Sequence, residues 1–310
     1  MKHNRFQSVA GPDQNQIQQI LLCYQSNDWD ATERALLRLV KEFPGHSFGW
    51  KALGVLSSHL QRLQAAEYFM RRALKLDPLE KECLSNLGMV LAQKGKLDEA
   101  ASCHRSVIRL APTEPLGYLN LGNILMLMGC LEDATVQYLI AIALSPSGSS
   151  AYANLATVYF DLGQLTSAEI FCIRAITITP DQFESWNTLG NSYRGQGRLQ
   201  RADMAFKLAM SHRPEYAEAY SNLGVVLREM SQFQDAMVNY RRALRIRPEL
   251  IEARSNLLYL MSSQGNMSDY LDEAKEFGRQ VSSARQFRYM HWSGNVPRIR
   301  IGFVSGDFRN

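Results

Sequence analysis

The stretch NLGMVLAQKGKLDEAASCHRSVIRLAPTE, residues 86–114, contains two amphipathic segments and two breaks, and it decides the fold. Apolar residues recur at helical spacing on both sides of Gly95, which predicts two helices. Glycine adopts the left-handed backbone that commonly ends a helix, so the first helix is expected to end there. The second helix is expected to stop before Pro112, because proline donates no backbone hydrogen bond and its ring clashes with the preceding turn. The stretch therefore predicts a helix–turn–helix unit.

The same unit recurs with a period of 34 residues. Seven prolines mark the period: Pro44, Pro78, Pro112, Pro146, Pro180, Pro214 and Pro248. With each proline counted as position 32 of a repeat, position 8 is small, at Gly54, Gly88, Gly122, Ala156, Gly190 and Gly224. Position 20 is alanine, at Ala66, Ala100, Ala134, Ala168, Ala202 and Ala236. This periodicity is typical of stacked helix pairs and predicts an all-α fold, a right-handed superhelix or α-solenoid.

Each recurring residue type has a physical reason. Small residues at positions 8 and 20 let the two helices of a repeat approach closely, and a larger side chain there would overpack at a cost of about 1–3 kcal/mol. Position 15, where a left-handed backbone is expected, is glycine at Gly95, Gly129, Gly163 and Gly197. Position 4 carries large side chains that are expected to pack against the neighbouring repeat: Trp50, Tyr118, Tyr152, Trp186 and Tyr220.

This pattern resembles the tetratricopeptide repeat. The resemblance covers residues 47–250 as six copies, with residues 13–46 as a degenerate first copy and residues 251–284 as a degenerate C-terminal copy or cap. Terminal repeats are atypical in such arrays, which suits both assignments. Residues 1–12 are expected to be a flexible N-terminus and residues 285–297 a linker. Pentatricopeptide RNA-binding repeats have a similar length, but the proline at position 32 and the small residues at positions 8 and 20 argue against them.

Asparagine recurs at position 6, which is expected to point into the concave groove of the superhelix. The residues at this position are Ala52, Asn86, Asn120, Asn154, Thr188, Asn222 and Asn256. Asparagine is a mediocre helix former because its amide competes for backbone hydrogen bonds, so its recurrence needs a reason. One amide offers both a donor and an acceptor, and can therefore satisfy the N–H and C=O groups of an extended peptide unit. We name the five asparagines the asparagine ladder and predict that, with Thr188, they bind extended protein segments.

Two interpretations of the asparagine ladder stay open at this point. Packed helix layers lie ~8–10 Å apart and an extended chain rises ~3.3 Å per residue, so one amide would meet roughly every third residue of a bound segment. That spacing suits sequence-tolerant binding of unstructured segments, and Thr188 would weaken the contact in its repeat. The alternative is that the asparagines bond only to neighbouring repeats and fix the superhelix.

An apolar run, NILMLMGC at residues 123–130, raises a second hypothesis. Met126 and Leu127 fall outside the positions that are expected to pack inward. Exposed apolar clusters can form homodimer contacts, so these two residues are a candidate dimer patch. Ordinary variation of the core is the other interpretation.

Composition narrows the function classes. The net charge of +4 over 310 residues is too small to indicate nucleic acid or an anionic membrane, and the basic cluster at residues 241–247 has no aromatic platform beside it. No apolar run is long enough to span a membrane, and the N-terminal residues lack the apolar core of a signal peptide. Five scattered cysteines without metal or redox spacing favour a reduced, cytoplasmic setting. No catalytic constellation or metal-ligand spacing is visible, so we expect no catalytic residue, metal or cofactor in this chain.

The C-terminal residues 298–310, RIRIGFVSGDFRN, differ from the repeats. Alternating apolar residues predict a short β-strand, and Ser305 begins a turn. Together with the end of the array, this segment resembles the junction in protein O-GlcNAc transferases of the tetratricopeptide kind, especially bacterial-type ones. Ser305, Asp307 and Phe308 match the Ser-x-Asp-Phe segment that opens the catalytic region of that family.

The resemblance implies a role for the array. In that family, a concave asparagine ladder holds protein substrates, and the superhelix leads into a two-lobed glycosyltransferase that uses UDP-GlcNAc to modify serine and threonine. Residues 298–310 would then be the first strand of a catalytic domain whose lobes and UDP-GlcNAc site are missing from this chain, which is expected to be inactive alone. A free-standing adaptor without glycosylation chemistry is the alternative, and RNA binding is a third hypothesis.

Overall fold

The computed structural model describes residues 11–264 and 267–284, and their regular structure is helical throughout. The first eight helices are α1 (Gln14–Gln25), α2 (Trp29–Glu42), α3 (Ser47–His59), α4 (Leu63–Leu76), α5 (Lys81–Gln93), α6 (Leu97–Leu110), α7 (Pro115–Leu127) and α8 (Leu131–Leu144). The next eight are α9 (Ser149–Asp161), α10 (Leu165–Ile178), α11 (Phe183–Gly195), α12 (Leu199–His212), α13 (Ala217–Glu229), α14 (Phe233–Ile246), α15 (Ile251–Gln264) and α16 (Met267–Ala284). The strand predicted at residues 298–310 and the linker predicted at residues 285–297 lie outside the described residues.

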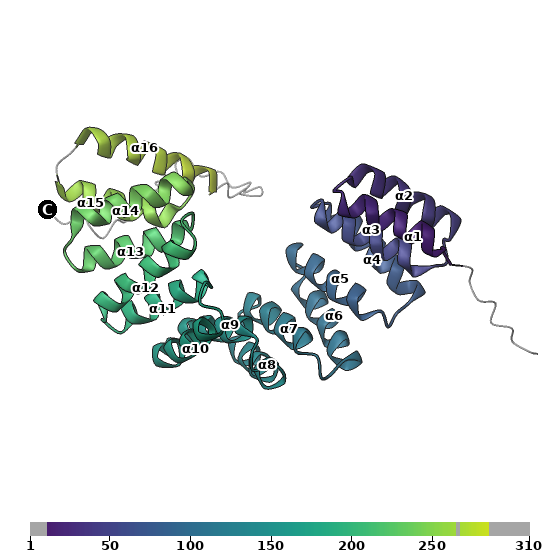
Figure 1. The fold of residues 1–310 in the computed structure, drawn as a ribbon. Helices are drawn as coiled ribbons and strands as arrows, with labels where there is room; N and C mark the ends of the chain where they lie inside the picture. The colour runs from purple at the N-terminus through teal and green to yellow at the C-terminus, as the bar shows by residue number, and fades with distance from the viewer. Residues whose placement is uncertain (1–10, 265–266, 285–310) are drawn as a thin grey trace, which may run out of the picture.

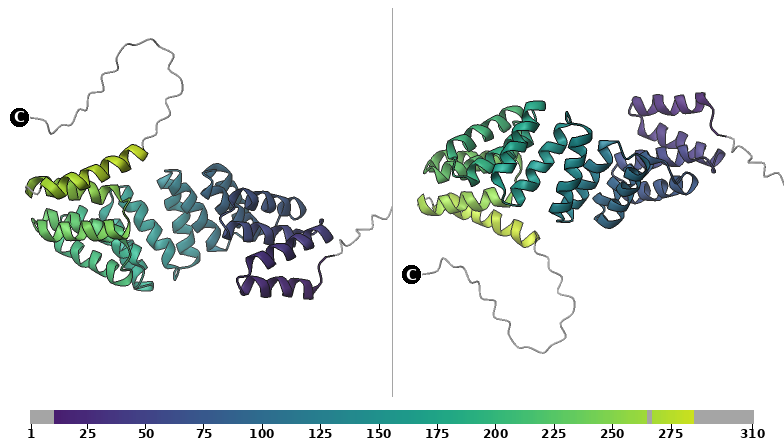
Figure 2. Two further views of the ribbon diagram at one scale, coloured as in Figure 1. Left: turned by 90° about the horizontal axis from the view of Figure 1, so that it is seen from above. Right: turned by 90° about the horizontal axis from the view of Figure 1, so that it is seen from below.

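The helices form pairs, and the pairs stack into an open arc (Figure 1). The two helices of a pair pack against each other, and each second helix packs against the first helix of the next pair. First helices also contact one another, as α9 contacts α11 and α11 contacts α13, so they line the inner, concave face. Views from above and below show that the arc also twists (Figure 2). The all-α superhelix predicted from the period is confirmed.

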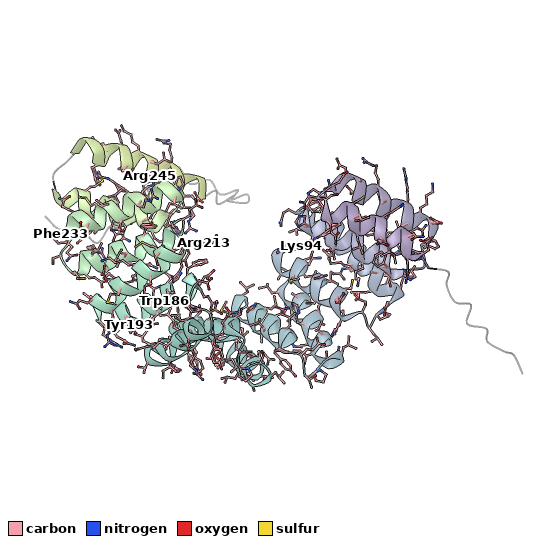
Figure 3. The ribbon with its side chains drawn as sticks, in the orientation of Figure 1. Lys94, Trp186, Tyr193, Arg213, Phe233 and Arg245 are labelled. Carbon is pink, nitrogen blue, oxygen red and sulfur yellow. The ribbon has the colours of Figure 1, made fainter. Side chains whose placement is uncertain are left out.

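Side chains at position 4 tie four of the repeats to the repeat before them. Trp50, Trp186 and Tyr118 each donate a hydrogen bond to the carbonyl of the preceding position-32 proline, at 3.0, 2.8 and 3.1 Å (Trp186 is labelled in Figure 3). In the last repeat the Arg254 guanidinium makes the same contact at 2.9 Å. A backbone carbonyl in a turn needs a hydrogen-bond partner. The position-4 side chains supply that partner and also pack against the preceding repeat. The sequence pattern predicted the packing and missed the hydrogen bond.

The small residue at position 8 lies against the side chain at position 24 of the second helix. A Cβ added at Gly190 would lie 2.7 Å from Cε1 of the Phe206 ring, which is fully buried. One repeat has alanine at position 8, and there the position-24 residue is small: Ala156 and Cys172 are both fully buried in the same core cluster. The size of one residue therefore limits the size of the other.

Position 15 has a left-handed backbone in seven repeats. The four glycines predicted for this role have φ between 72° and 76°. Asn27, Gln61 and Ser231 occupy the same position with φ of 59°, 58° and 63°. The left-handed conformation therefore follows from the packing of the helix pair. Glycine lowers its free-energy cost, because glycine has no Cβ to clash with the neighbouring carbonyl.

His104 is a packing residue at position 24. It is 1% exposed, and neither ring nitrogen has a hydrogen-bond partner among the described residues. Burial lowers the pKa of the imidazole to about 4, so the ring is neutral at physiological pH. It fills the space that tyrosine or phenylalanine fills in other repeats.

Glu67 links two repeats through a buried carboxylate. The side chain is nearly buried on α4 and accepts hydrogen bonds from Lys94 and Lys96 of the next repeat and from Arg71 of its own helix. The hydrogen bonds from Lys94 and Lys96 lower the pKa of the Glu67 carboxyl to about 2, against the opposing effect of burial. This contact belongs to the neighbour-to-neighbour packing that stabilises repeat arrays.

Candidate functional site on the concave face

The position-6 residues lie on the first helices that line the concave face. They are Asn86 on α5, Asn120 on α7, Asn154 on α9, Thr188 on α11, Asn222 on α13 and Asn256 on α15. All six are half-buried. Positions 2, 6 and 9 share one face of a helix, so these residues have groove-facing neighbours one turn before and one turn after them.

Two of the asparagines donate an amide hydrogen to position 5 of the preceding repeat. The Nδ2 atom of Asn222 lies 3.0 Å from Oδ1 of Asn187, which is itself nearly buried. The Nδ2 atom of Asn120 lies 3.5 Å from Oγ of Ser85, a longer and weaker contact. These bonds orient the amides relative to the neighbouring repeat.

Asn154 ends a chain of hydrogen bonds that begins in the core. The fully buried Tyr138 donates its hydroxyl to Oδ1 of Asn123 at 2.8 Å, and the same oxygen accepts from Nδ2 of Asn154 at 2.7 Å. Burial raises the pKa of Tyr138, which keeps its hydroxyl protonated as a donor. These two hydrogen bonds fix the Asn154 amide in place. Its carbonyl oxygen has no hydrogen-bond partner within the described residues.

The two interpretations of the asparagine ladder are therefore compatible. Asn120, Asn154 and Asn222 each donate one amide hydrogen to a residue of the preceding repeat, which fixes the repeats relative to each other. A primary amide has a second hydrogen and a carbonyl oxygen, so each can still contact a ligand. Asn86 and Asn256 make no side-chain hydrogen bond to any described residue. The structure thus distinguishes three anchored amides from two free ones, which the sequence alone could not do.

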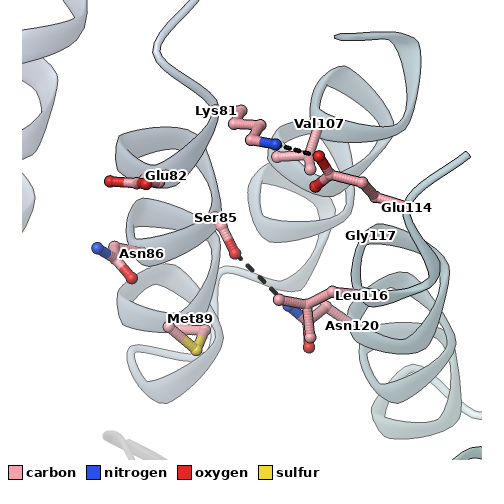
Figure 4. A pocket seen from close by; sticks show the side chains of 10 residues that line it. All are labelled: Lys81, Glu82, Ser85, Asn86, Met89, Val107, Glu114, Leu116, Gly117 and Asn120. Carbon is pink, nitrogen blue, oxygen red and sulfur yellow. Dashed lines mark hydrogen bonds and ion pairs between the residues drawn. The ribbon is translucent and has the colours of Figure 1, made fainter. Parts of the chain in front are cut away.

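A pocket opens between α5 and α7, and two ladder residues line it (Figure 4). Its volume is about 580 Å³. Asn86 and Asn120 supply amides, and Met89 and Leu116, which are 47% and 57% exposed, supply apolar surface. The pocket therefore offers hydrogen-bonding groups for a main chain beside contact surface for an apolar side chain.

Charges at the pocket rim are paired with one another. Lys81 forms an ion pair with Glu114, which joins the two repeats across the pocket (Figure 4). Lys51 of the preceding repeat lies 3.0 Å from a Glu80 oxygen and 3.1 Å from a Glu82 oxygen. Partial burial opposes the charge of Lys51, but the two carboxylates raise its pKa overall. With these charges compensated, the pocket favours neutral polar and apolar contacts.

Leu116 also lines a second, smaller pocket between α7 and α9, with a volume of about 160 Å³. Leu119 and Ala151 add to its mostly apolar lining. Position-2 and position-9 residues such as Leu116 and Met89 were not predicted as site residues. Their spacing of three or four residues from position 6 was the signal that could have identified them.

The two residues of the predicted dimer patch lie at the C-terminal end of α7, in different surroundings. Leu127 is 62% exposed. Met126 is half-buried and packs against the core cluster that extends from Ala66 to Val158. Of this pair, Leu127 alone offers a large exposed surface.

Three family models, each described as tetratricopeptide repeat, match this sequence. The matched residues are 181–249 for one model, 18–81 and 61–115 for the second, and 149–182 for the third. Together they span well over half of the chain, and they coincide with the helix pairs described above. The chain belongs to the tetratricopeptide-repeat proteins.

Solved structures show the same fold at low sequence identity. The structure entitled "Crystal structure of APC/C hetero-tetramer Cut9-Hcn1" matches with a TM-score of 0.66 and 19% identity over 78% of this chain and 48% of that chain. This chain thus spans about half of that protein, and the likeness establishes the fold alone. MamA matches at 22% identity with a TM-score of 0.47, over 55% of this chain and 92% of that one. YrrB, described as a TPR protein with an unusual peptide-binding site, matches at 20% identity with a TM-score of 0.46, over 59% of this chain and 95% of that one.

A comparison with curated proteins finds no match. None of the helices in residues 11–264 and 267–284 has the length and apolar character needed to cross a bilayer. Within the same residues, no three His, Cys, Asp or Glu side chains cluster in a way that could hold a metal ion.

Proposed function

We propose that this array binds extended segments of other proteins along its concave face, with the asparagine ladder contacting their main chain. The supporting observation is the pocket between α5 and α7, where the amides of Asn86 and Asn120 stand beside the exposed apolar side chains of Met89 and Leu116. This combination suits an extended segment, whose peptide groups need hydrogen bonds and whose side chains alternate in direction. Binding of partner segments is the role proposed for the whole groove.

Pre-orientation of the amides supports the same proposal. A free asparagine side chain loses conformational freedom when it binds a ligand, which weakens binding. Tyr138 and Asn123 already hold Asn154 in place, and Asn187 holds Asn222. These two asparagines therefore lose less entropy on binding than Asn86, and we expect them to contribute more to affinity.

The test uses two unrelated, unstructured peptides of equal length, both rich in serine, threonine and proline and labelled with a fluorophore. Each amide contact contributes about 0.5–1.5 kcal/mol, so replacing Asn120, Asn154 and Asn222 together by alanine should weaken binding of both peptides about 100-fold. The matched control is Asn239→Ala on α14, whose amide donates to a main-chain carbonyl of its own helix at 2.9 Å. Unchanged affinity in a folded triple variant would refute the asparagine ladder as a binding element.

We further propose that the bound segments are substrates of an O-GlcNAc-transferase-like enzyme, with UDP-GlcNAc as the sugar donor of a catalytic domain. The support is the resemblance of residues 298–310 to the start of that domain, and these residues lie outside the described ones. This chain would supply substrate binding and not the transfer. A free-standing adaptor is the alternative.

Two measurements separate these proposals. Calorimetric titration of UDP-GlcNAc into this chain should show no binding, and tight binding would contradict the assignment of the sugar site to another domain. Gene sequence beyond Asn310 is the second measurement. A histidine soon after it, followed by a long α/β pattern, supports the transferase, whereas a stop codon there favours the adaptor.

A further inference from the structure

Three pockets lie at equivalent positions of successive repeats. The pocket between α3 and α5 is lined by Ser47, Phe48, Lys51, Ala73, Glu80 and Cys83. The residues one period further along the chain all line the pocket between α5 and α7, and those two periods further along all line the pocket between α7 and α9. The three pockets therefore form a row on the concave face, which repeats with the sequence.

The charges around the first two pockets are compensated within the chain. In the pocket between α3 and α5, Nζ of Lys51 lies 3.0 Å from a Glu80 oxygen, and the remaining volume is about 80 Å³. In the pocket between α5 and α7, Lys81 pairs with Glu114. Glu82 of the same pocket pairs with Lys51 at 3.1 Å. A charged ligand side chain therefore gains little in either pocket.

The described residues that line the pocket between α7 and α9 are all uncharged. Position 34, which is Glu114 in the pocket before it, is Gly148 here. Position 1, which is Lys81 in the pocket before it, is Pro115 here. Leu116 lines both pockets and forms an apolar wall between them (Figure 4). The two larger pockets of the row, between α5 and α7 and between α7 and α9, therefore suit neutral, apolar side chains.

The spacing of these two pockets favours one extended conformation of a ligand. The pockets are one repeat apart, and first helices that pack against each other lie ~8–10 Å apart. A polyproline II helix has about three residues per turn and rises ~3.1 Å per residue, so side chains three residues apart point the same way, ~9 Å from each other. In a β-strand, side chains on the same side are only ~6.6 Å apart. One turn of polyproline II therefore matches one repeat.

The asparagine ladder has the same period as the row. Asn86 and Asn120 line the pocket between α5 and α7, one from each of its two first helices (Figure 4). A polyproline II segment makes no hydrogen bonds within itself, so its peptide groups stay available for amides of a binding protein. Each turn of such a segment would meet one amide and one side-chain pocket.

We propose that the row selects segments in the polyproline II conformation with large aliphatic side chains three residues apart, one in the pocket between α5 and α7 and the next in the pocket between α7 and α9. The inference rests on the proposed binding of extended segments, and it adds a conformation and a side-chain preference. The compensated charges of one pocket and the uncharged lining of the other indicate a neutral occupant. The asparagine ladder binds any main chain, and the row makes the binding selective.

Fluorescence anisotropy with labelled peptides tests the inference on the whole chain. All peptides share one unstructured sequence that contains two leucines, and the leucines are two, three or four positions apart. Reference peptides have two alanines or two glutamates instead. The peptide with leucines three positions apart should bind at least about tenfold tighter than the other leucine peptides, because only that spacing buries both side chains. The glutamate peptide should bind no tighter than the alanine peptide.

Two variants locate the leucines. Leu116→Ser removes the wall between the pockets, and the next repeat already has Ser150 at that position. Gly148→Glu places at the rim of the α7–α9 pocket the glutamate that the two preceding repeats have at position 34. Each variant should reduce the preference for the spacing of three to less than about twofold. The control is Val238→Ser on α14, a 62% exposed residue of a second helix, which should keep the full preference.

The possible results separate this inference from the proposed function. Equal binding of the alanine peptide and all leucine peptides would overturn the selectivity of the row and leave main-chain binding intact. Tightest binding at a spacing of two or four, or of the glutamate peptide, would also overturn the inference. So would an unchanged preference in Leu116→Ser and Gly148→Glu with their fold verified by circular dichroism. Failure of every peptide to bind, the alanine peptide included, would refute the proposed function and this inference with it.

Discussion

The contact between positions 8 and 24 predicts that the effect of Gly190→Ala on stability depends on the residue at position 206. The substitution should destabilise the fold when Phe206 is present and stabilise it when a smaller residue replaces the ring. In Gly190→Ala the new Cβ would lie 2.7 Å from Cε1, 2.8 Å from Cζ and 2.9 Å from Cδ1 of Phe206. These distances are too short for carbon atoms, and the ring is fully buried with no space to move. Overpacking costs about 1–3 kcal/mol, whereas alanine favours a helix over glycine by about 1 kcal/mol. The net effect should be a loss of up to about 2 kcal/mol.

The background variant is Phe206→Cys, which reproduces the small residue that faces Ala156 in the repeat before it. Alone it should destabilise the array by about 3 kcal/mol, because a large ring leaves the core. Without the ring there is room for the added Cβ, so Gly190→Ala in this background should stabilise by about 1 kcal/mol. The two residues are therefore coupled by about 1–3 kcal/mol, the overpacking cost that the ring imposes.

Urea unfolding followed by far-ultraviolet circular dichroism measures the four variants of this cycle, fitted with nearest-neighbour coupling because repeats unfold in contact with their neighbours. The control is Gly278→Ala on α16, where no atom lies within 4 Å of the added Cβ and a gain of about 1 kcal/mol is expected. The reasoning is refuted if Gly190→Ala stabilises the wild type as Gly278→Ala does.

Three further predictions concern backbone strain and pH. Gln61→Gly and Ser231→Gly should each raise the free energy of unfolding by about 1 kcal/mol, because both residues adopt a left-handed backbone; thermal melts check this. His104 has a pKa of about 4 in the fold against 6.5 ordinarily, so the unfolded chain gains a proton first as pH falls. Stability should therefore drop by about 3 kcal/mol between pH 6.5 and 4, and His104→Phe should flatten that decline in urea unfolding. Glu67 has a pKa of about 2, so its contribution is complete above pH 4.5 and lost toward pH 2; Glu67→Gln should destabilise at pH 7 but not at pH 2.

The 34-residue period made the fold predictable, because the prolines and small residues that recur are those that end helices or allow helices to pack closely. Pro112 ends a helix, and Gly190 makes room for a ring, wherever such a unit occurs. Positions at which an unusual residue type replaces the common one, and still makes the same contact or adopts the same backbone conformation, were harder to predict. Arg254 bonds the proline carbonyl as tryptophan does elsewhere, and Gln61 adopts a glycine conformation, because the packed helix pair imposes the geometry.

The candidate site was predictable in position but not in detail. The 34-residue spacing located Asn154 on the concave face, since every first helix has the same orientation. Its partner Asn123 is at position 9 of the preceding repeat, and the neighbouring repeats use position 5 instead, so no fixed spacing identifies the acceptor. The exposed apolar side chains of α8 and α10 were not predicted, because these two helices are apolar on most sides and have little periodic signal to separate exposed from buried residues. Exposure of Leu139 and Ile173 becomes visible only when the repeats are stacked.

The central claim is that the groove binds the main chain of an extended segment, and one measurement tests it directly. The measurement compares a peptide that binds with its depsipeptide analogue, in which an ester replaces the amide at every third residue and all side chains are kept. Esters lack the N–H donor and have a weaker acceptor, so the analogue should lose affinity about tenfold or more per contacted amide pair. Equal affinity of the two molecules would show that side chains, and not the main chain, determine binding to the asparagine ladder.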